Sequence, residues 1–289
     1  MMPTPSLSQT HGFASLDRRL ARCAAIGFAL AVGGAPAAAQ PAKDAPCPTA
    51  PSATAIVAAV GADLDITLAD GRVLAVSGVE PPRATPDAPR RAQDVRDALT
   101  ARLAGRSLAW APLGPPDRWS RYPAAIFAPG DLAADLLQQG LVRWRPDRVA
   151  SPCRAALIAA EDSARRAGRG VWADPALGPV RVDDQFDRDA LPAAAEDGMV
   201  VVEGVVAGVG ETPARLYLNL GRARGGFALS VSKRDKALME SGAFSQARIV
   251  GARLRARGLL DRRFGPQIEL NGPDALEIVT PAAPDAPKP

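Results

Sequence analysis

The chain has 289 residues, of which 47% are hydrophobic and 23% are charged, and its formal net charge is +4 at pH 7. This length suffices for two domains of ordinary size, and the charge is too small to indicate nucleic-acid binding by itself. The only histidine, His11, lies in a segment that we expect to be removed on export. The mature protein would therefore contain no histidine, which excludes Ser-His-Asp and Cys-His catalysis and any histidine-ligated metal site.

Residues 1–39 have the composition of a secretory signal peptide. Arg18, Arg19 and Arg22 precede an apolar segment, and three alanines at 37–39 provide small residues for cleavage. An uncleaved membrane anchor is the alternative, but glycines and a proline interrupt the apolar segment, which is short for a bilayer crossing of about 20 residues. We therefore expect a periplasmic or secreted protein with no transmembrane segment after cleavage.

Removal of the signal peptide takes away Cys23 and leaves two cysteines, Cys47 and Cys153. Disulfides persist in exported proteins, so we expect these two cysteines to pair; two free thiols are the alternative. The bond would close a loop of about a hundred residues and contribute about 4 to 5 kcal/mol in the chain-entropy model. Residues 40–53, rich in proline, alanine and serine, are expected to form a flexible leader that contains Cys47.

Residues 54–83 have the pattern of a β-meander. Ile66 and Leu68 alternate with polar residues, Asp70-Gly71 is a tight-turn pair, and the next apolar strand begins at Val73. We expect this meander to be the architectural centre of the first domain.

The remainder of the first domain is predicted to combine strands with three helices. Three segments have the apolar periodicity and the terminal glycine of helices, and two have the pattern of strands. The helices are predicted at 92–105, 131–140 and 153–167, and the strands at 107–111 and 124–127. The predicted fold class is therefore mainly β with α, with a small β-barrel and three helices over residues 54–174.

A second domain is predicted after an acidic linker. Residues 175–197 contain three prolines and six acidic residues, which is typical of a linker. From 198 to 280 the pattern is three strands, a helix at 233–244 and two further strands. This order predicts a second, smaller OB-like barrel, followed by a disordered tail at 281–289.

The second domain is rich in arginine. Arg253, Arg255 and Arg257 alternate with apolar residues, so we expect them to share one face of a strand. One interpretation is a stripe that binds the phosphates of nucleic acid or another polyanion. The other interpretation is a solvated face of an arginine-rich composition.

Several short motifs in residues 54–174 follow the order and spacing of a known family. They are LADG at 68–71, SGVEPP at 77–82, DRWSR at 117–121, LLQQGLV at 136–142 and GVW at 170–172. On these motifs the first domain resembles the staphylococcal nuclease (thermonuclease) family, whose barrel is an OB-fold. The segment 198–280 resembles the OB-like domain that follows nuclease-like domains in some bacterial exported proteins.

The resemblance implies calcium-assisted hydrolysis of phosphodiester bonds. In the family, carboxylates hold Ca²⁺, a glutamate activates or positions water, and two arginines neutralise charge in the transition state. Transferred to this sequence, the first metal carboxylate falls between Gly61 and Asp65. An ungapped alignment puts Leu64 there, and one inserted residue puts Asp63 there. The second metal carboxylate corresponds to Glu80.

The other functional positions of the family are mostly replaced. Ala75 stands where the resemblance places the first arginine, and Arg83 stands where it places the catalytic glutamate. Only the second arginine is kept, as Arg121. Arg121 is alternatively a structural residue paired with Asp117 across a turn, and Asp63 and Asp65 are alternatively solvated loop carboxylates.

We therefore expect an exported thermonuclease-family protein that is catalytically impaired or inactive and needs no cofactor. Loss of one transition-state donor costs about 10² to 10³ in rate, and here an arginine and the glutamate are both replaced. The expected role is a binding or scaffold module, with nucleic acid or another polyanion as ligand. The alternative is a remodelled Ca²⁺-dependent nuclease in which Asp63, Asp65 and Glu80 hold the ion. The sequence identifies no protein partner.

Overall fold

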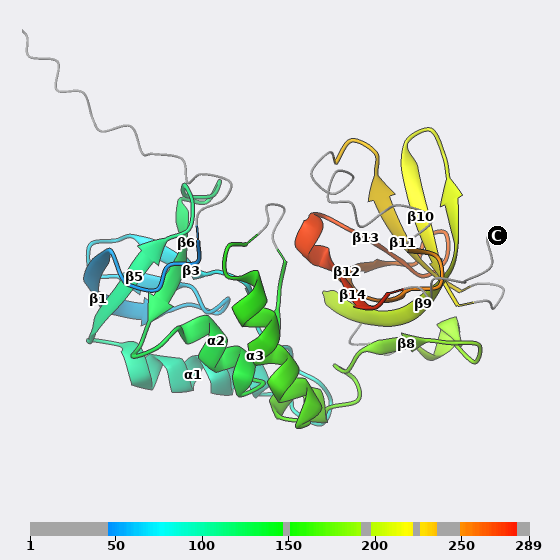
Figure 1. Cartoon of the computed structure of the whole chain (residues 1–289). Helices are drawn as coiled ribbons and strands as arrows, with labels where there is room; N and C mark the ends of the chain where they lie inside the picture. Colours follow the sequence, from blue (N-terminus) through cyan, green and yellow to red (C-terminus); the bar gives the residue numbers. More distant parts are fainter. Residues whose placement is uncertain (1–45, 147–150, 192–197, 222–225, 236–248, 282–289) are drawn as a thin grey trace, which may run out of the picture. The chain divides into compact units, whose positions relative to one another are not determined.

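The computed structural model describes residues 46–146, 151–191, 198–221, 226–235 and 249–281 (Figure 1). All described residues belong to one compact unit, 39–289. These residues are mainly β with three helices, as the sequence predicts. No helix among them is long and apolar enough to cross a membrane. The predicted signal peptide lies outside the described residues.

The first barrel is closed by five strands. They are β1 (Ala53–Val60), β2 (Ile66–Leu68), β3 (Val73–Val76), β5 (Ser107–Pro112) and β6 (Arg121–Phe127), paired in the order β1-β2-β3-β6-β5. β3 and β6 run parallel, and the other neighbours are antiparallel. The predicted hairpin is confirmed, because Ile66 pairs with Leu74 across a turn in which Gly71 has a φ of 86°.

Three helices accompany this barrel: α1 (Arg91–Leu103), α2 (Leu132–Gln138) and α3 (Arg154–Arg166) (Figure 1). All three helices were predicted from the sequence. α1 buries Val95, Leu99 and Leu103, the i, i+4, i+8 residues that predicted it. α2 begins at Asp131, whose carboxylate accepts the backbone N–H of Ala134 and so caps the helix. α2 packs against α3 and β6.

A short ladder links the barrel to α3. β4 (Val79–Glu80) pairs with β7 (Arg143–Trp144), and the fully buried Trp144 donates its backbone N–H to Oε1 of Glu161 on α3 at 2.7 Å. Gly78 precedes this ladder with a φ of 79°, and a Cβ there would lie 2.3 Å from the Trp144 ring. Glycine is therefore required at this position, and it sets the path of the chain into Glu80.

The second barrel has the same strand order as the first. Its strands are β9 (Met199–Glu211), β10 (Arg215–Leu220), β11 (Phe227–Ser232), β12 (Arg253–Asp261) and β13 (Gln267–Glu269). They pair in the circuit β9-β10-β11-β13-β12-β9, and β11 and β13 are parallel, as β3 and β6 are. Each barrel therefore has its strands in the order first, second, third, fifth, fourth. This connectivity confirms the predicted OB-like barrel.

Two further strands extend the second sheet. β14 (Leu276–Thr280) pairs with β12, and β8 (Val180–Val182) pairs in parallel with β9. β8 lies within residues 175–197, which the sequence predicted to be a linker. Val182 is buried there, and Phe186 contacts Phe227 edge-on, with 6.2 Å between ring centroids. A strand of three residues is too short for a periodicity to reveal it. The predicted helix at 233–244 falls almost wholly outside the described residues.

Cys47 and Cys153 form a disulfide, which confirms the expected pair and excludes the two free thiols. The bond links the segment before β1 to the residue before α3, across a sequence separation of 106 residues. It closes a loop that contains the whole first barrel.

We expect Cys47→Ser to lower the free energy of unfolding by about 4 kcal/mol, because it releases a loop of this length in the unfolded chain. Urea unfolding followed by tryptophan fluorescence measures the change. A reductant should destabilise the wild-type protein by a similar amount and leave Cys47→Ser unchanged. Equal stability of the oxidised and reduced wild-type protein would contradict the expectation.

Candidate functional site

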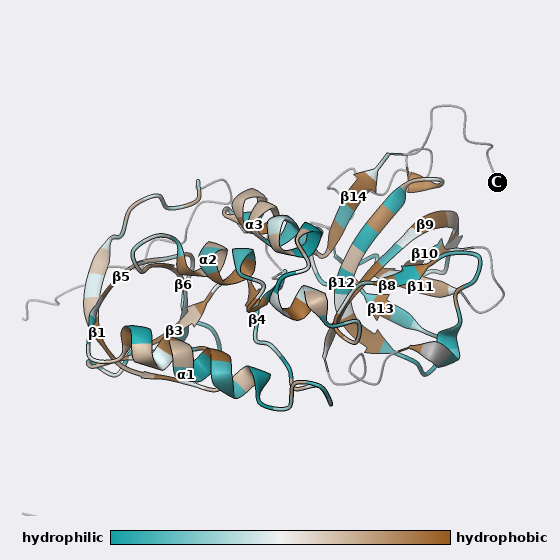
Figure 2. Ribbon diagram, turned by 90° about the horizontal axis from the view of Figure 1, so that it is seen from below, coloured by the Kyte–Doolittle hydropathy of each residue, from teal (hydrophilic) through white to brown (hydrophobic). Residues whose placement is uncertain are grey.

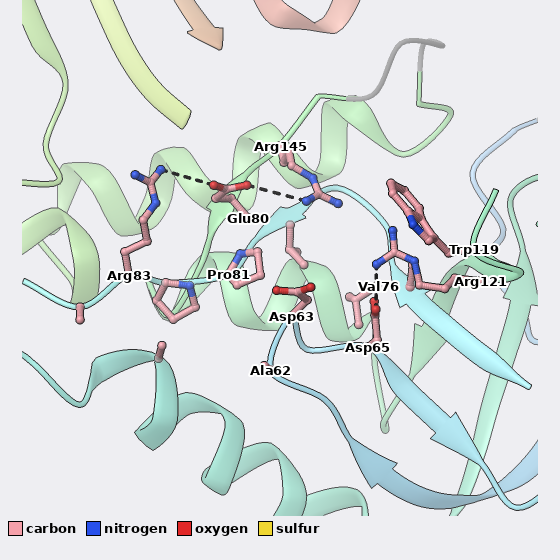
Figure 3. A pocket seen from close by; sticks show the side chains of 15 residues that line it. Ala62, Asp63, Asp65, Val76, Glu80, Pro81, Arg83, Trp119, Arg121 and Arg145 are labelled. Atoms are coloured by element: carbon pink, nitrogen blue, oxygen red, sulfur yellow. Dashed lines mark hydrogen bonds and ion pairs between the residues drawn. The ribbon is translucent and has the colours of Figure 1, made fainter. Parts of the chain in front are cut away.

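The site residues predicted on the first barrel gather in one cleft, with a volume of about 930 Å³ (Figure 3). The loop between β1 and β2 provides Asp63 and Asp65, β3 provides Ala75, β4 provides Glu80, the following segment provides Arg83, and β6 provides Arg121. These distant segments meet because β3 and β6 are neighbours in the barrel. The sequence left open whether Asp63 and Asp65 are solvated loop residues, and the structure places both of them with Glu80 in one cleft.

Arg121 is held by two carboxylates. Its Nη1 donates to Oδ2 of Asp65 at 2.8 Å, and its Nε donates to Oδ2 of Asp117 at 2.9 Å. The hydrogen bond to Asp65, followed by that to Asp117, raises the pKa of Arg121. The expected pairing of Arg121 with Asp117 is therefore confirmed. Asp65 is its second partner, so Asp65 is not a solvated loop carboxylate.

Glu80 lies between two arginines, as Figure 3 shows. Its Oε1 accepts from Nη2 of Arg83 at 3.4 Å, and its Oε2 lies 3.8 Å from Nη1 of Arg145. Sequence reasoning missed Arg145, which directly follows β7. Only the pairing of β4 with β7 brings it beside Glu80, and no local motif indicates that pairing.

Arg83 connects the cleft to the start of β9. Its Nη2 donates to the carbonyl of Met199 at 2.9 Å, and its guanidinium carbon lies 2.3 Å from the position that a Cβ on Gly198 would take. The buried Arg143 donates to the same carbonyl at 2.7 Å. Burial, together with the nearby Arg83, lowers the pKa of Arg143 to about 10. Arg83, which the resemblance places at the position of a catalytic glutamate, therefore anchors the start of β9.

The cleft does not fit the calcium site that the resemblance implies. Ca²⁺ takes about six to eight oxygen ligands. Asp65 and Glu80 are already paired with arginines, whose positive charge opposes a cation, and Asp63 is exposed. Within the described ranges, no group of three or more His, Cys, Asp or Glu side chains could hold a metal ion. Calcium belongs to the alternative hypothesis of an active nuclease, and the described residues offer no preformed set of ligands for it.

A comparison with models of protein families finds no match for this chain, and a comparison with curated proteins finds none either. The thermonuclease resemblance therefore stays an interpretation of the sequence motifs.

The predicted polyanion stripe on β12 is not a surface feature. Arg253 is exposed, but the side chains of Arg255 and Arg257 are only 4% and 1% exposed. The alternation itself is correct, because Leu254 and Ala256 belong to the core of the second barrel, and Figure 2 shows the alternating bands along β12. Both interpretations, the phosphate stripe and the solvated face, are wrong for Arg255 and Arg257.

Acidic residues enclose these two arginines. Nε of Arg255 donates to Oε1 of Glu203 at 2.7 Å, and its Nη1 lies 3.1 Å from Asp162. Nη2 of Arg257 lies 2.6 Å from Oε2 of Glu161 and 2.7 Å from Oε1 of Glu277. Burial opposes the charge of Arg257, but the facing carboxylates of Glu161 and Glu277 outweigh it and raise the pKa of Arg257. The outward face of β12 is thus an ionic contact with α3.

Asp174 fixes the segment that forms one wall of the cleft. Its Oδ2 accepts from Oγ1 of Thr85 at 2.9 Å and from Nη2 of Arg91 at 2.7 Å. Burial opposes the charge of Asp174, but these hydrogen bonds hold its pKa below the usual value of 3.8. The chain that follows Glu80 is therefore tied to the segment that follows α3.

We expect Asp174→Asn to lower the free energy of unfolding by about 2 kcal/mol at neutral pH, since it removes charged hydrogen bonds. A carboxylate whose pKa is lowered by folding contributes stability above its unfolded pKa and loses it as the pH falls through the folded value. The unfolding midpoint of the wild type should therefore fall more steeply below about pH 4 than that of Asp174→Asn. Asp97→Asn, at an exposed aspartate of α1, is the control. Parallel curves for wild type and Asp174→Asn would refute the expectation.

We expect Arg257→Ala to lower the free energy of unfolding by about 3 to 5 kcal/mol, because it leaves the buried carboxylate of Glu161 without its cation. Arg253→Ala removes an exposed arginine from the same strand and should change stability by less than about 0.5 kcal/mol. Chemical unfolding of both variants measures the difference. Equal stabilities would show that the buried pair is not needed.

Proposed function

We propose that this protein is an exported, thermonuclease-like protein that binds nucleic acid or another polyanion without hydrolysing it. The pairing of the cleft carboxylates with arginines carries this proposal: Asp65 with Arg121, and Glu80 with Arg83 and Arg145. These ion pairs occupy carboxylate oxygens and place positive charge beside them. Such a carboxylate is a poor metal ligand and a poor base.

The groups that would stabilise a hydrolytic transition state are also missing or occupied. Ala75 has no charge, Arg83 anchors the start of β9, and Arg121 is engaged by two aspartates. Each lost transition-state donor costs about 10² to 10³ in rate. A cleft with this arrangement supports binding better than catalysis.

The edge of the cleft favours a ligand with flat, unpaired rings. Trp119 is 61% exposed on the loop between β5 and β6, where it lines the cleft. The guanidinium of Arg121 lies 4.9 Å from the centroid of its ring. Exposed aromatic rings beside arginines are typical of surfaces on which nucleic-acid bases stack.

Two features support export. The disulfide between Cys47 and Cys153 requires an oxidising compartment to persist, such as the periplasm or the extracellular space. Residues 1–39 have the charged, apolar and small-residue segments of a signal peptide.

The proposal is tested by incubating the purified mature protein with single-stranded DNA and RNA, in calcium and in chelator, beside an active calcium-dependent nuclease. We expect no calcium-dependent cleavage, because arginines are paired with the carboxylates of the cleft. Calcium-dependent cleavage that disappears in Glu80→Gln would contradict the proposal and establish the remodelled nuclease instead.

A further inference from the structure

A second concave surface lies on the second barrel and shares no lining residue with the cleft. Two adjoining cavities, of about 590 and 540 Å³, have Tyr217, Phe264 and Gln267 in common. β10, β11, β13 and the loop between β12 and β13 form their walls. We call this surface the Tyr217–Phe264 groove, and its polar walls include Arg188, Arg215, Arg263 and Gln267.

The groove presents aromatic and apolar side chains to solvent. Phe264 is 91% exposed and Leu259 is 66% exposed, while Tyr217 on β10 is half-buried. Phe264 therefore contributes little to the core of the barrel. An exposed phenylalanine gains free energy when a ligand covers it.

Arginines outnumber carboxylates in the groove. Four arginines and two carboxylates line the two cavities. Arg215 is paired with Glu269 at 3.1 Å and Arg263 with Asp261 at 2.9 Å. The side chain of Arg263 is 81% exposed, and surface pairs of this kind are weak. Arg263 can therefore exchange Asp261 for a phosphate at little cost, and the surplus positive charge attracts a polyanion.

The groove and the cleft each include the loop between the fourth and fifth strands of their barrel. In each barrel an exposed aromatic lies on the loop between the fourth and fifth strands: Trp119 between β5 and β6, and Phe264 between β12 and β13. In OB-type barrels this loop and the face of the second and third strands form the usual surface for oligonucleotides and oligosaccharides.

We propose that the Tyr217–Phe264 groove binds single-stranded nucleic acid, with bases stacked on Tyr217 and Phe264 and phosphates beside Arg215 and Arg263. Stacking on these rings requires unpaired base faces, which selects single strands over duplexes. The surplus of arginine favours this polyanion over a neutral oligosaccharide. The inference shares its ligand class with the proposed function, but it rests on a different surface and different residues.

The test is fluorescence anisotropy of a labelled oligothymidylate with the full mature protein, at low and at high salt. We expect binding that weakens with salt and is stronger than binding to a duplex of equal length. Phe264→Ala and Tyr217→Ala should each weaken binding by about tenfold, because each removes a stacking surface. Arg263→Ala should weaken binding by about threefold and reduce its salt dependence.

Matched controls separate the groove from general surface effects. Ile56→Ala removes an exposed apolar side chain of β1, and Arg166→Ala removes an exposed arginine at the end of α3; both should bind as the wild type does. Tyr217→Phe keeps the ring and should also bind normally. Normal binding by Tyr217→Phe would support base stacking on the ring, and loss of binding in this variant would contradict stacking.

Three results would overturn the inference. Unchanged affinity in both Phe264→Ala and Tyr217→Ala would exclude the groove as the binding site. Loss of binding in Trp119→Ala, with normal binding in the two groove variants, would assign the ligand to the cleft. Salt-insensitive binding of a neutral oligosaccharide, without binding of the oligonucleotide, would show that the ligand is an oligosaccharide and not a nucleic acid. These three results do not depend on the cleavage assay. The binding measurements test the groove through Phe264 and Tyr217, whereas the cleavage assay tests the cleft through Glu80.

Discussion

The buried pair of Glu161 and Arg257 is the interaction on which the arrangement of the described residues depends. Glu161 accepts the backbone N–H of Trp144 with one oxygen and faces Arg257 with the other. Since β7 pairs with β4, the carboxylate that positions Trp144 also supports the strand that carries Glu80. Removing two charges from water is costly, and their attraction compensates only when both partners are present. The cleft and the outer face of β12 are therefore coupled through one side chain of α3.

Arginines around the cleft have an architectural role. Arg83 and Arg143 both donate to the carbonyl of Met199, and Arg121 connects the loop before β2 with the loop before β6. Arg83 thus anchors the start of β9. The charged side chains of the cleft thus hold together segments that are distant in the sequence.

Local signals in the sequence predicted most of the fold. The Asp70-Gly71 turn and the i, i+4, i+8 apolar residues of α1 depend on neighbouring residues alone, so the hairpin and the helix could be identified. The burial of Arg255 could not, because alternation along a strand shows which residues share a face but not what covers that face. Arg145 could not be identified from the sequence for a similar reason, since only a pairing between distant segments brings it to Glu80.

The disulfide has a topological consequence. Cys47 precedes β1 and Cys153 follows β7, so the bond makes the backbone of the first barrel a covalent ring. A single cut by a protease anywhere between these cysteines would leave both pieces attached to each other. Tension applied to the chain outside the ring would pass through the sulfur atoms and bypass the barrel strands. The barrel thus tolerates a break in its own backbone without losing either half.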